Sequence, residues 1–266
     1  MKFAAGLLAL ICSALAIGAA HAQVSAFATY KGTEGPVDHS AYAAFLETYL
    51  VEDDGVLLVA YGAVSSEDKA ALDAYVADLQ ALDPTALSRD EAFAYWANLY
   101  NALTLQLILD EYPVKSIREL KSGLISIGPW GRELAEVNGV TLTLNDIEHE
   151  ILREFWDEPR VHYAVNCASI GCPNLKRSPW TGEGLDADLT SAARAYINHP
   201  RGVSVSNGRV TASTIYKWFR EDFGGDEAAV LDHVRLYADD ELKAALDGVT
   251  RIRKYEYDWS LNEAKQ

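Results

Sequence analysis

Basic residues are scarce in this chain, and their scarcity excludes two classes of partner. The 266 residues include 23 Lys and Arg against 39 Asp and Glu, which gives a formal net charge of −16. Because nucleic acids and anionic membrane surfaces repel such a protein, neither is an expected partner. The GxGxxG and P-loop patterns that cradle phosphates are also missing, so a nucleotide-binding fold has no support and no cofactor is expected.

Long apolar runs are missing too, except at the start of the chain. Residues 1–22 combine one cation, Lys2, with an apolar run and the small-residue ending Ala20-His21-Ala22. This layout is typical of a secretory signal peptide that is cleaved after Ala22. No later segment is apolar enough to span a bilayer, so no membrane insertion is expected after cleavage. The sequence therefore predicts an acidic, soluble protein that is periplasmic or secreted.

Cysteine is rare, with three residues in the chain. Cys12 lies inside the predicted signal peptide, where the preceding Ile11 lacks the small side chain that lipoprotein processing requires. Cleavage would leave Cys167 and Cys172. An even count in an exported chain suggests a disulfide.

Apolar side chains are plentiful, at 49% of the chain, which excludes intrinsic disorder. Residues 23–37 are small and polar, and they predict a flexible lead-in. Hydrophobic periodicity, alternation and turn residues predict the elements that follow. Helices are expected at 39–50, 66–82, 88–113, 143–156, 185–198, 213–223 and 226–246, and strands at 114–120, 133–143, 161–167 and 249–257, with an Asn-Gly hairpin at 203–212. Strands and helices do not alternate regularly along the chain as they do in βαβ units. Residues 38–262 are therefore predicted to form a single α+β domain, helix-rich with a small antiparallel or mixed sheet.

The predicted helix 88–113 is apolar almost all round, which indicates a central, buried position. Ser88 is placed to cap its first turn. Its polar exceptions Asn98, Asn101 and Thr104 recur every three residues. Buried amides need hydrogen-bond partners, so these residues either tie neighbouring loops to the helix or line a binding site.

The predicted helix 143–156 carries two further candidates. Glu148 projects into the middle of its apolar face, while His149 points to the side. A carboxylate among apolar neighbours needs a partner. Asn145 and Glu148 have the spacing of a helix-capping box, which is one explanation. A catalytic or ligand-binding carboxylate is the other.

The stretch RVHYAVNCASIGCPNL contains a histidine and both remaining cysteines. In a strand over 161–167, His162 and Cys167 would point to opposite faces, so His149 is an equally good partner for the thiol. Three interpretations stay open: a Cys167–Cys172 disulfide, a Cys167 nucleophile activated by an imidazole, and a zinc site. The last has the least support because no CxxC or HExxH spacing is present, and no metal site is predicted.

Four blocks of the sequence together resemble a known family. They are YWANLYNALTLQLI, TLNDIEHEILRE, PRVHYAVNCASIGCPNL and the terminal YDWSLN. In this order and spacing they resemble the bacterial, exported members of the family called domain of unknown function 547, over about residues 90–262. The resemblance implies a shared fold, and it suggests that the blocks around Asn98/Asn101, Glu148/His149 and His162/Cys167/Cys172 meet in space. It implies no reaction, because the family has no established one.

Two functions follow as hypotheses, and the sequence does not decide whether the protein is an enzyme. The first is a non-catalytic protein that binds an unknown small molecule or protein, or serves as a scaffold, with a Cys167–Cys172 bridge. The second is a thiol-dependent hydrolase or acyl transferase. Its nucleophile would be Cys167, its base His162 or His149, and Glu148 would orient the imidazole. Asn98 or Asn101 would then donate a hydrogen bond to the developing oxyanion.

Overall fold

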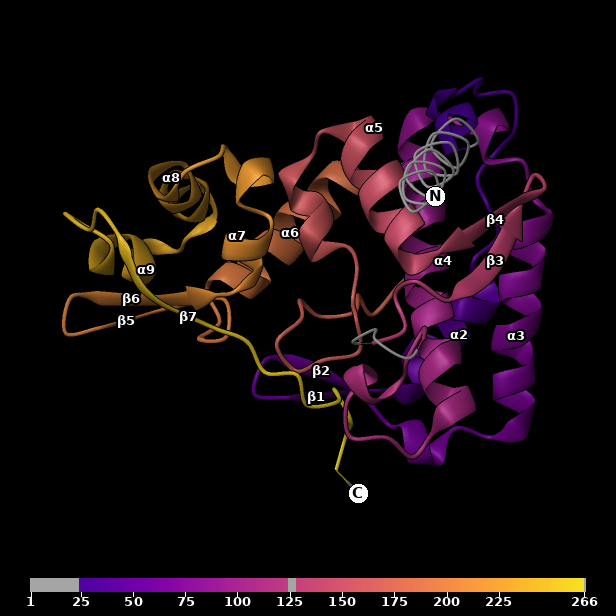
Figure 1. Ribbon diagram of the computed structural model, residues 1–266, viewed down its shortest axis with the longest axis horizontal. Coiled ribbons are helices and arrows are strands. Elements are labelled where there is room, and N and C mark those ends of the chain that lie inside the picture. Colours follow the sequence, from indigo (N-terminus) through magenta and orange to yellow (C-terminus); the bar gives the residue numbers. More distant parts are fainter. Residues whose placement is uncertain (1–23, 124–127, 266) are drawn as a thin grey trace, which may run out of the picture.

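One long helix, α4 (Arg89–Glu111), lies at the centre of the first of two cores (Figure 1). The computed structural model describes residues 24–123 and 128–265, so the predicted signal peptide lies outside the described residues. As predicted, Ser88 caps the helix, because its Oγ accepts a hydrogen bond from the Glu91 N–H. Nearly every side chain of α4 is buried, including those of Asn98 and Asn101. The helix ends just before Pro113, where the sequence predicts its end.

The first core surrounds α4. Helix α3 (Ser66–Ala81) packs on α4, and α2 (Ser40–Tyr49) packs on α3. Two antiparallel hairpins border this layer, β1–β2 and β3–β4. The segment predicted as a flexible lead-in packs here as well, since Phe27 is buried with its ring 5.0 Å from that of Trp96.

The second core is built on the later part of the chain. Its sheet has the order β5-β6-β7, with β5 antiparallel and β7 parallel to β6. The predicted Asn-Gly hairpin is present, with positive φ at Asn207 and Gly208 as its tight turn requires. Helices α6, α8 and α9 belong to this part. With its small antiparallel and mixed sheets among many helices, the chain is a single α+β domain, as predicted.

The elements have the following bounds. The strands are β1 (Leu50–Asp53), β2 (Val56–Val59), β3 (Glu133–Val137), β4 (Val140–Thr143), β5 (Val203–Ser206), β6 (Arg209–Ser213) and β7 (Ile252–Glu256). The later α-helices are α5 (Glu154–Trp156), α6 (Leu185–Ile197), α7 (Ile215–Trp218), α8 (Glu227–Tyr237) and α9 (Asp240–Ala245). Short 3₁₀ helices cover Ser25–Ala28, Tyr61–Ala63, Pro84–Ala86, Ile117–Glu119, Pro159–Tyr163 and Arg220–Phe223, and a π-helix covers Asp146–Arg153.

Two predicted strands are wrong. Residues 114–120 contain the 3₁₀ helix Ile117–Glu119, capped by Ser116. Residues 161–167 begin in the 3₁₀ helix Pro159–Tyr163 and continue as a loop. Proline supplies a helical φ at the first position of this helix, and the Glu158 side chain accepts the hydrogen bond of the Arg160 N–H. These local caps outweigh the strand-like alternation of the sequence.

Two predicted helices are divided. The 226–246 helix breaks at extended Ala238, and Asp239 then caps α9 through the Leu242 N–H. The 213–223 helix becomes α7 followed by a 3₁₀ helix, and it ends at the left-handed Gly224. In the part of the chain that the structure describes, no helix is both long and apolar enough to cross a bilayer.

Candidate functional site

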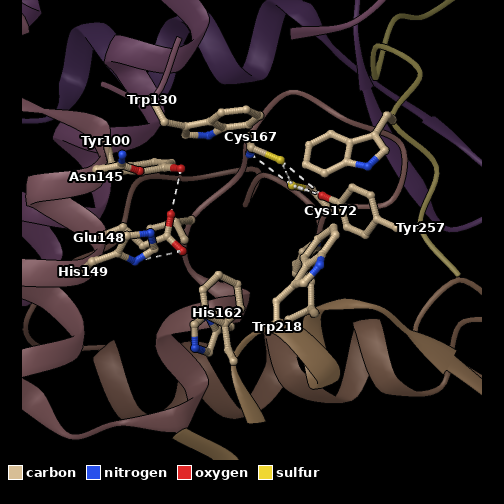
Figure 2. A pocket seen from close by; sticks show the side chains of 15 residues that line it. Tyr100, Trp130, Asn145, Glu148, His149, His162, Cys167, Cys172, Trp218 and Tyr257 are labelled. Carbon is tan, nitrogen blue, oxygen red and sulfur yellow. Dashed lines mark hydrogen bonds and ion pairs between the residues drawn. The ribbon is translucent and has the colours of Figure 1, made fainter. Parts of the chain in front are cut away.

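A cavity of about 190 Å³ lies where the two cores meet (Figure 2). The first core contributes Tyr100 and Trp130, and the second contributes Ile215 and Tyr257. The residues that line it are Tyr100, Trp130, Asn145, Glu148, His149, His162, Val165, Cys167, Cys172, Pro173, Ile215, Trp218, Phe219, Tyr257 and Trp259. All four residues predicted as catalytic candidates therefore line one cavity.

The helix cap expected from Asn145 and Glu148 is absent. Asn145 has helical dihedral angles and makes no capping hydrogen bond. Thr143 and Asp146 form the reciprocal cap instead: Thr143 Oγ1 accepts from the Asp146 N–H, and Asp146 Oδ2 accepts from the Thr143 N–H. The cap thus begins two residues earlier than predicted, and Glu148 is released from the capping role.

Glu148 and His149 lie together at one end of the cavity (Figure 2). The π-helix that carries them is a rare winding found often at functional sites. Tyr100 donates a hydrogen bond of 3.0 Å to Oε2 of Glu148. Oε1 lies 3.9 Å from Nδ1 of His149, beyond hydrogen-bond distance. Glu148 is 8% exposed, and no hydrogen bond from the described residues reaches its Oε1, which leaves that oxygen for another partner.

His162 is held by a carboxylate that the sequence analysis missed. Its Nε2 lies 2.6 Å from Oδ2 of Asp222, and its ring stacks on Phe219 with centroids 4.2 Å apart. Arg153 donates two hydrogen bonds to the same carboxylate. Burial acts to raise the pKa of Asp222, but these hydrogen bonds outweigh it and hold the pKa well below its ordinary value. Asp222 is remote in sequence, so only the tertiary fold reveals the pairing.

Asn98 and Asn101 do not line the cavity, and their hydrogen bonds tie loops to α4. Asn98 exchanges two hydrogen bonds with the backbone of Trp180. Asn101 donates to the carbonyl of Ala164 and accepts from the N–H of Asn166, both at 2.8 Å. The sequence left two roles open for these amides, tying neighbouring loops to the helix or lining a binding site. Their hydrogen bonds are those of the first role.

The two cysteines meet at the other end of the cavity (Figure 2). Both are free thiols, so the predicted disulfide is not formed in this structure, and the Sγ atoms lie 2.6 Å apart. The hydroxyl of Tyr257 lies 3.1 Å from Sγ of Cys167 and 3.0 Å from Sγ of Cys172. Cys167 is half-buried, whereas Cys172 is only 4% exposed.

A glycine explains how Tyr257 comes so close. Gly171 forms a hydrogen bond of 2.8 Å from its N–H to the carbonyl of Asp258. A Cβ atom at Gly171 would lie 2.8 Å from the Asp258 nitrogen and 2.9 Å from Tyr257 Cγ. Only glycine permits the terminal YDWSLN segment to pass this close to the cysteine loop.

The two thiols have opposite pKa shifts. The contact with Cys172, followed by burial, raises the pKa of Cys167 well above its ordinary value. Burial acts to raise the pKa of Cys172 too, but hydrogen bonds from Cys167 and Tyr257 outweigh burial and lower it. The pair therefore favours a thiolate on Cys172 rather than on Cys167, the nucleophile considered from the sequence.

No imidazole contacts either sulfur in the described part of the chain. The hydrogen-bond partners of the thiols are each other, Ser169, Tyr257 and the Cys167 N–H. Figure 2 shows Glu148 and His149 across the cavity from the cysteines, with His162 on a third side. Glu148, His149 and Cys167 thus share a cavity without forming a hydrogen-bonded catalytic triad.

Aromatic rings form much of the remaining wall. Trp218 packs on Tyr257 and Trp259, with ring centroids 4.9 and 5.5 Å apart, and Trp130 packs on Trp259 at 5.7 Å. Trp218 is nevertheless 47% exposed, which is unusual for so large an apolar ring. The sequence shows these tryptophans but not which of them leave the core.

Within residues 24–123 and 128–265, no group of three or more His, Cys, Asp and Glu side chains is arranged to hold a metal ion.

Comparisons with known proteins give one match. Neither the curated proteins nor the solved structures include a match to this chain. Three of the four sequence blocks lie within residues 84–197, whereas the terminal YDWSLN lies outside that range. Residues 84–197 match the model of the family described as "Protein of unknown function, DUF547", so this segment is similar to that domain family.

Proposed function

We propose that this chain is an exported domain that binds a small organic ligand carrying an ammonium group in the Glu148 cavity. The supporting observation is a nearly buried carboxylate with an uncommitted oxygen beside a wall of aromatic rings. Aromatic faces attract cations, and more strongly where water is excluded. A carboxylate adds charge-assisted hydrogen bonds to the same group.

The dimensions of the site support a small ligand. The cavity of about 190 Å³ is smaller than the 300–1,000 Å³ of pockets that hold drug-sized molecules. The half-exposed ring of Trp218 gives the site an aromatic edge open to solvent. The net charge of −16 would attract a cationic ligand toward the protein.

The Cys167–Cys172 bridge expected from the sequence belongs to this proposal. In an oxidising compartment the two adjacent thiols would join, and the bridge would fix one wall of the cavity. Intact-mass measurement of protein exported by its own signal would detect the bridge as the loss of two hydrogens.

Replacing Glu148 with glutamine tests the ligand class. We expect neopentylammonium to quench the cavity tryptophans at lower concentration than its neutral isostere neopentyl alcohol. Glu148→Gln keeps the shape and removes the charge, so it should weaken neopentylammonium binding about 10-fold or more and leave the alcohol unaffected. Fluorescence titration at constant ionic strength measures both.

Glu154→Gln is the matched control, because Glu154 is exposed and directly follows the π-helix. It removes the same charge without touching the cavity and should leave the affinity unchanged. Equal binding of the cation and the alcohol, or equal losses in the two variants, would contradict the proposed ligand class.

A second candidate is thiol-dependent hydrolysis or acyl transfer. It is favoured by the lowered pKa of Cys172 and by two imidazoles in the wall of the same cavity. The reduced protein would then cleave a small activated ester such as p-nitrophenyl acetate. Cys172→Ser removes the sulfur whose thiolate is favoured, so it should lower that rate by about 10³-fold or more. If the reduced wild-type protein cleaves the ester no faster than a variant with both Cys167→Ser and Cys172→Ser, this function is excluded.

A further inference from the structure

The cysteine pair has the features of a reactive dithiol rather than of a buried structural disulfide. Both sulfurs line the cavity, 2.6 Å apart, and only one of them is partly accessible. Structural cysteines are usually inert because they are buried in apolar surroundings. Here a hydroxyl group and a backbone N–H, those of Tyr257 and Cys167, are directed at the sulfur of Cys172.

The loop between the cysteines is held in a strained conformation. Ala168 has φ of 56°, a left-handed conformation that is unfavourable for a residue with a Cβ atom. The Asn166 side chain stabilises it by accepting from the Ala168 N–H at 2.7 Å and donating to the Pro173 carbonyl at 2.6 Å. Strain that the surroundings enforce in this way is typical of functional sites.

Arg201 holds the end of the loop that carries Cys172, as Asn166 holds its beginning. The guanidinium of Arg201 is half-buried and donates to the carbonyl of Ile170 and to the side chain of Asn174. These two residues flank Gly171 and Cys172. The loop is thus fixed on both sides, so the sulfurs stay adjacent whether they are bonded or free.

The two sulfurs are suited to different roles in thiol–disulfide exchange. An incoming thiolate must reach the sulfur it attacks, and Cys167 is the accessible one. The sulfur that leaves should be the one whose thiolate is better stabilised, because such a thiolate departs faster. Cys172 receives the stabilising hydrogen bonds and has the lowered pKa.

We propose that Cys167 and Cys172 form a redox-active pair that exchanges with a small thiol entering the cavity. In the bridged form, the substrate thiolate attacks Sγ of Cys167, the Cys167–Cys172 bond breaks, and its electron pair leaves on Cys172. A second substrate thiolate attacks the substrate sulfur of this mixed disulfide and releases Cys167. The products are one small disulfide and the protein dithiol seen in the structure. Two protons pass from the two substrate thiols to the two cysteines.

This activity goes beyond ligand binding and does not depend on the ammonium ligand. The exchange is measured without any ammonium compound, so its outcome stands even if the ligand-binding proposal fails. Tyr257 serves as a positioning residue that stabilises the leaving Cys172 thiolate.

Glutathione is the probe for the main experiment. Full-length mature protein is equilibrated in buffers of reduced and oxidised glutathione, quenched with acid and examined by intact mass. We expect the wild-type chain to pass reversibly between the bridged and dithiol forms while it remains folded. A bridge that resists reduced glutathione until the protein is unfolded would overturn the proposal, and this measurement requires no variant.

Two single variants separate the roles of the sulfurs. With Cys172→Ser, oxidised glutathione can still react with Cys167, but no second cysteine displaces the glutathione to form the bridge, so one glutathione should accumulate on Cys167. With Cys167→Ser, the remaining sulfur is buried, and its adduct should form at least about 10-fold more slowly. Equal rates at the two cysteines would refute the assignment of attacked and leaving sulfurs.

Tyr257→Phe tests the positioning role. Loss of the hydroxyl should slow reduction of the bridge by glutathione about 10-fold, and it should move the pH profile for iodoacetamide alkylation of the reduced pair to higher pH. Tyr255→Phe is the matched control, because the Tyr255 hydroxyl donates to Glu227 and not to sulfur. If the two variants reduce at the same rate, Tyr257 has no role in the exchange.

Discussion

Replacing Asn101 with alanine is expected to lower the free energy of unfolding by about 3–4 kcal/mol. The Asn101 side chain is 2% exposed and bonds two backbone groups, the Ala164 carbonyl and the Asn166 N–H. Alanine would leave both groups buried without these partners, at a cost of about 1–3 kcal/mol each. The effect should extend to the site, because Asn166 in turn holds the cysteine loop.

Urea unfolding of the two proteins at neutral pH measures this loss. Asn145→Ala is the control, because it removes the same amide at an exposed helical position where Asn145 makes no capping hydrogen bond. It should change stability by less than about 0.5 kcal/mol. A loss below about 1 kcal/mol in Asn101→Ala would mean that water or a shifted loop replaces the amide.

Local signals in the sequence were sufficient for the long elements. Ser88 and Pro113 bound α4, and the Asn-Gly turn marks the β5–β6 hairpin, because capping and turn chemistry act within a few residues. The apolar character of α4 also predicts its central position. The same reasoning places Glu148 on a buried helix face, where the structure has it.

The short elements around the site were beyond such reasoning. Residues 161–165 alternate like a strand, yet Pro159 and the Glu158 cap impose a 3₁₀ turn. A π-helix has no periodicity that eight residues could reveal, so the winding at Glu148 was not predictable. Here local backbone chemistry and tertiary packing outweigh hydrophobic pattern.

The partners of the site residues come from remote parts of the chain. Asp222 reaches His162 across 60 positions, and Tyr257 reaches Cys167 across 90. Nothing in either segment marks them as partners, since a lone Asp or Tyr has many ordinary uses. The family resemblance indicated that the Glu148/His149 and Cys167/Cys172 blocks meet, but it gave no place to Asp222 or to the YDWSLN block. It could not say which atoms would touch.

Acid is expected to destabilise the fold well above the pH at which carboxylates titrate. Burial, the largest cause, lowers the pKa of His233 from 6.5 to about 4, and Arg160 and His162 act in the same direction against Glu158. Above pH 6.5 both the folded and the unfolded chain keep this histidine neutral, so its contribution to stability is fully present. As the pH falls from 6.5 toward 4, the unfolded chain takes up a proton that the folded chain does not, and stability is lost.

The size of this loss follows from the same shift. Each pH unit within the window costs about 1.4 kcal/mol, and partial exposure of the ring reduces the total to about 2–3 kcal/mol. His233→Gln should remove that part of the pH dependence, because glutamine does not titrate and its amide can still accept from the Tyr163 hydroxyl, which now lies 2.9 Å from Nε2. Urea unfolding of both proteins at pH 7.5 and pH 4.5 gives the double difference, which cancels any cost of the substitution that is independent of pH. If both proteins lose the same stability between these two values, another group carries the acid sensitivity, and His233 is protonated in the folded chain as readily as in the unfolded one.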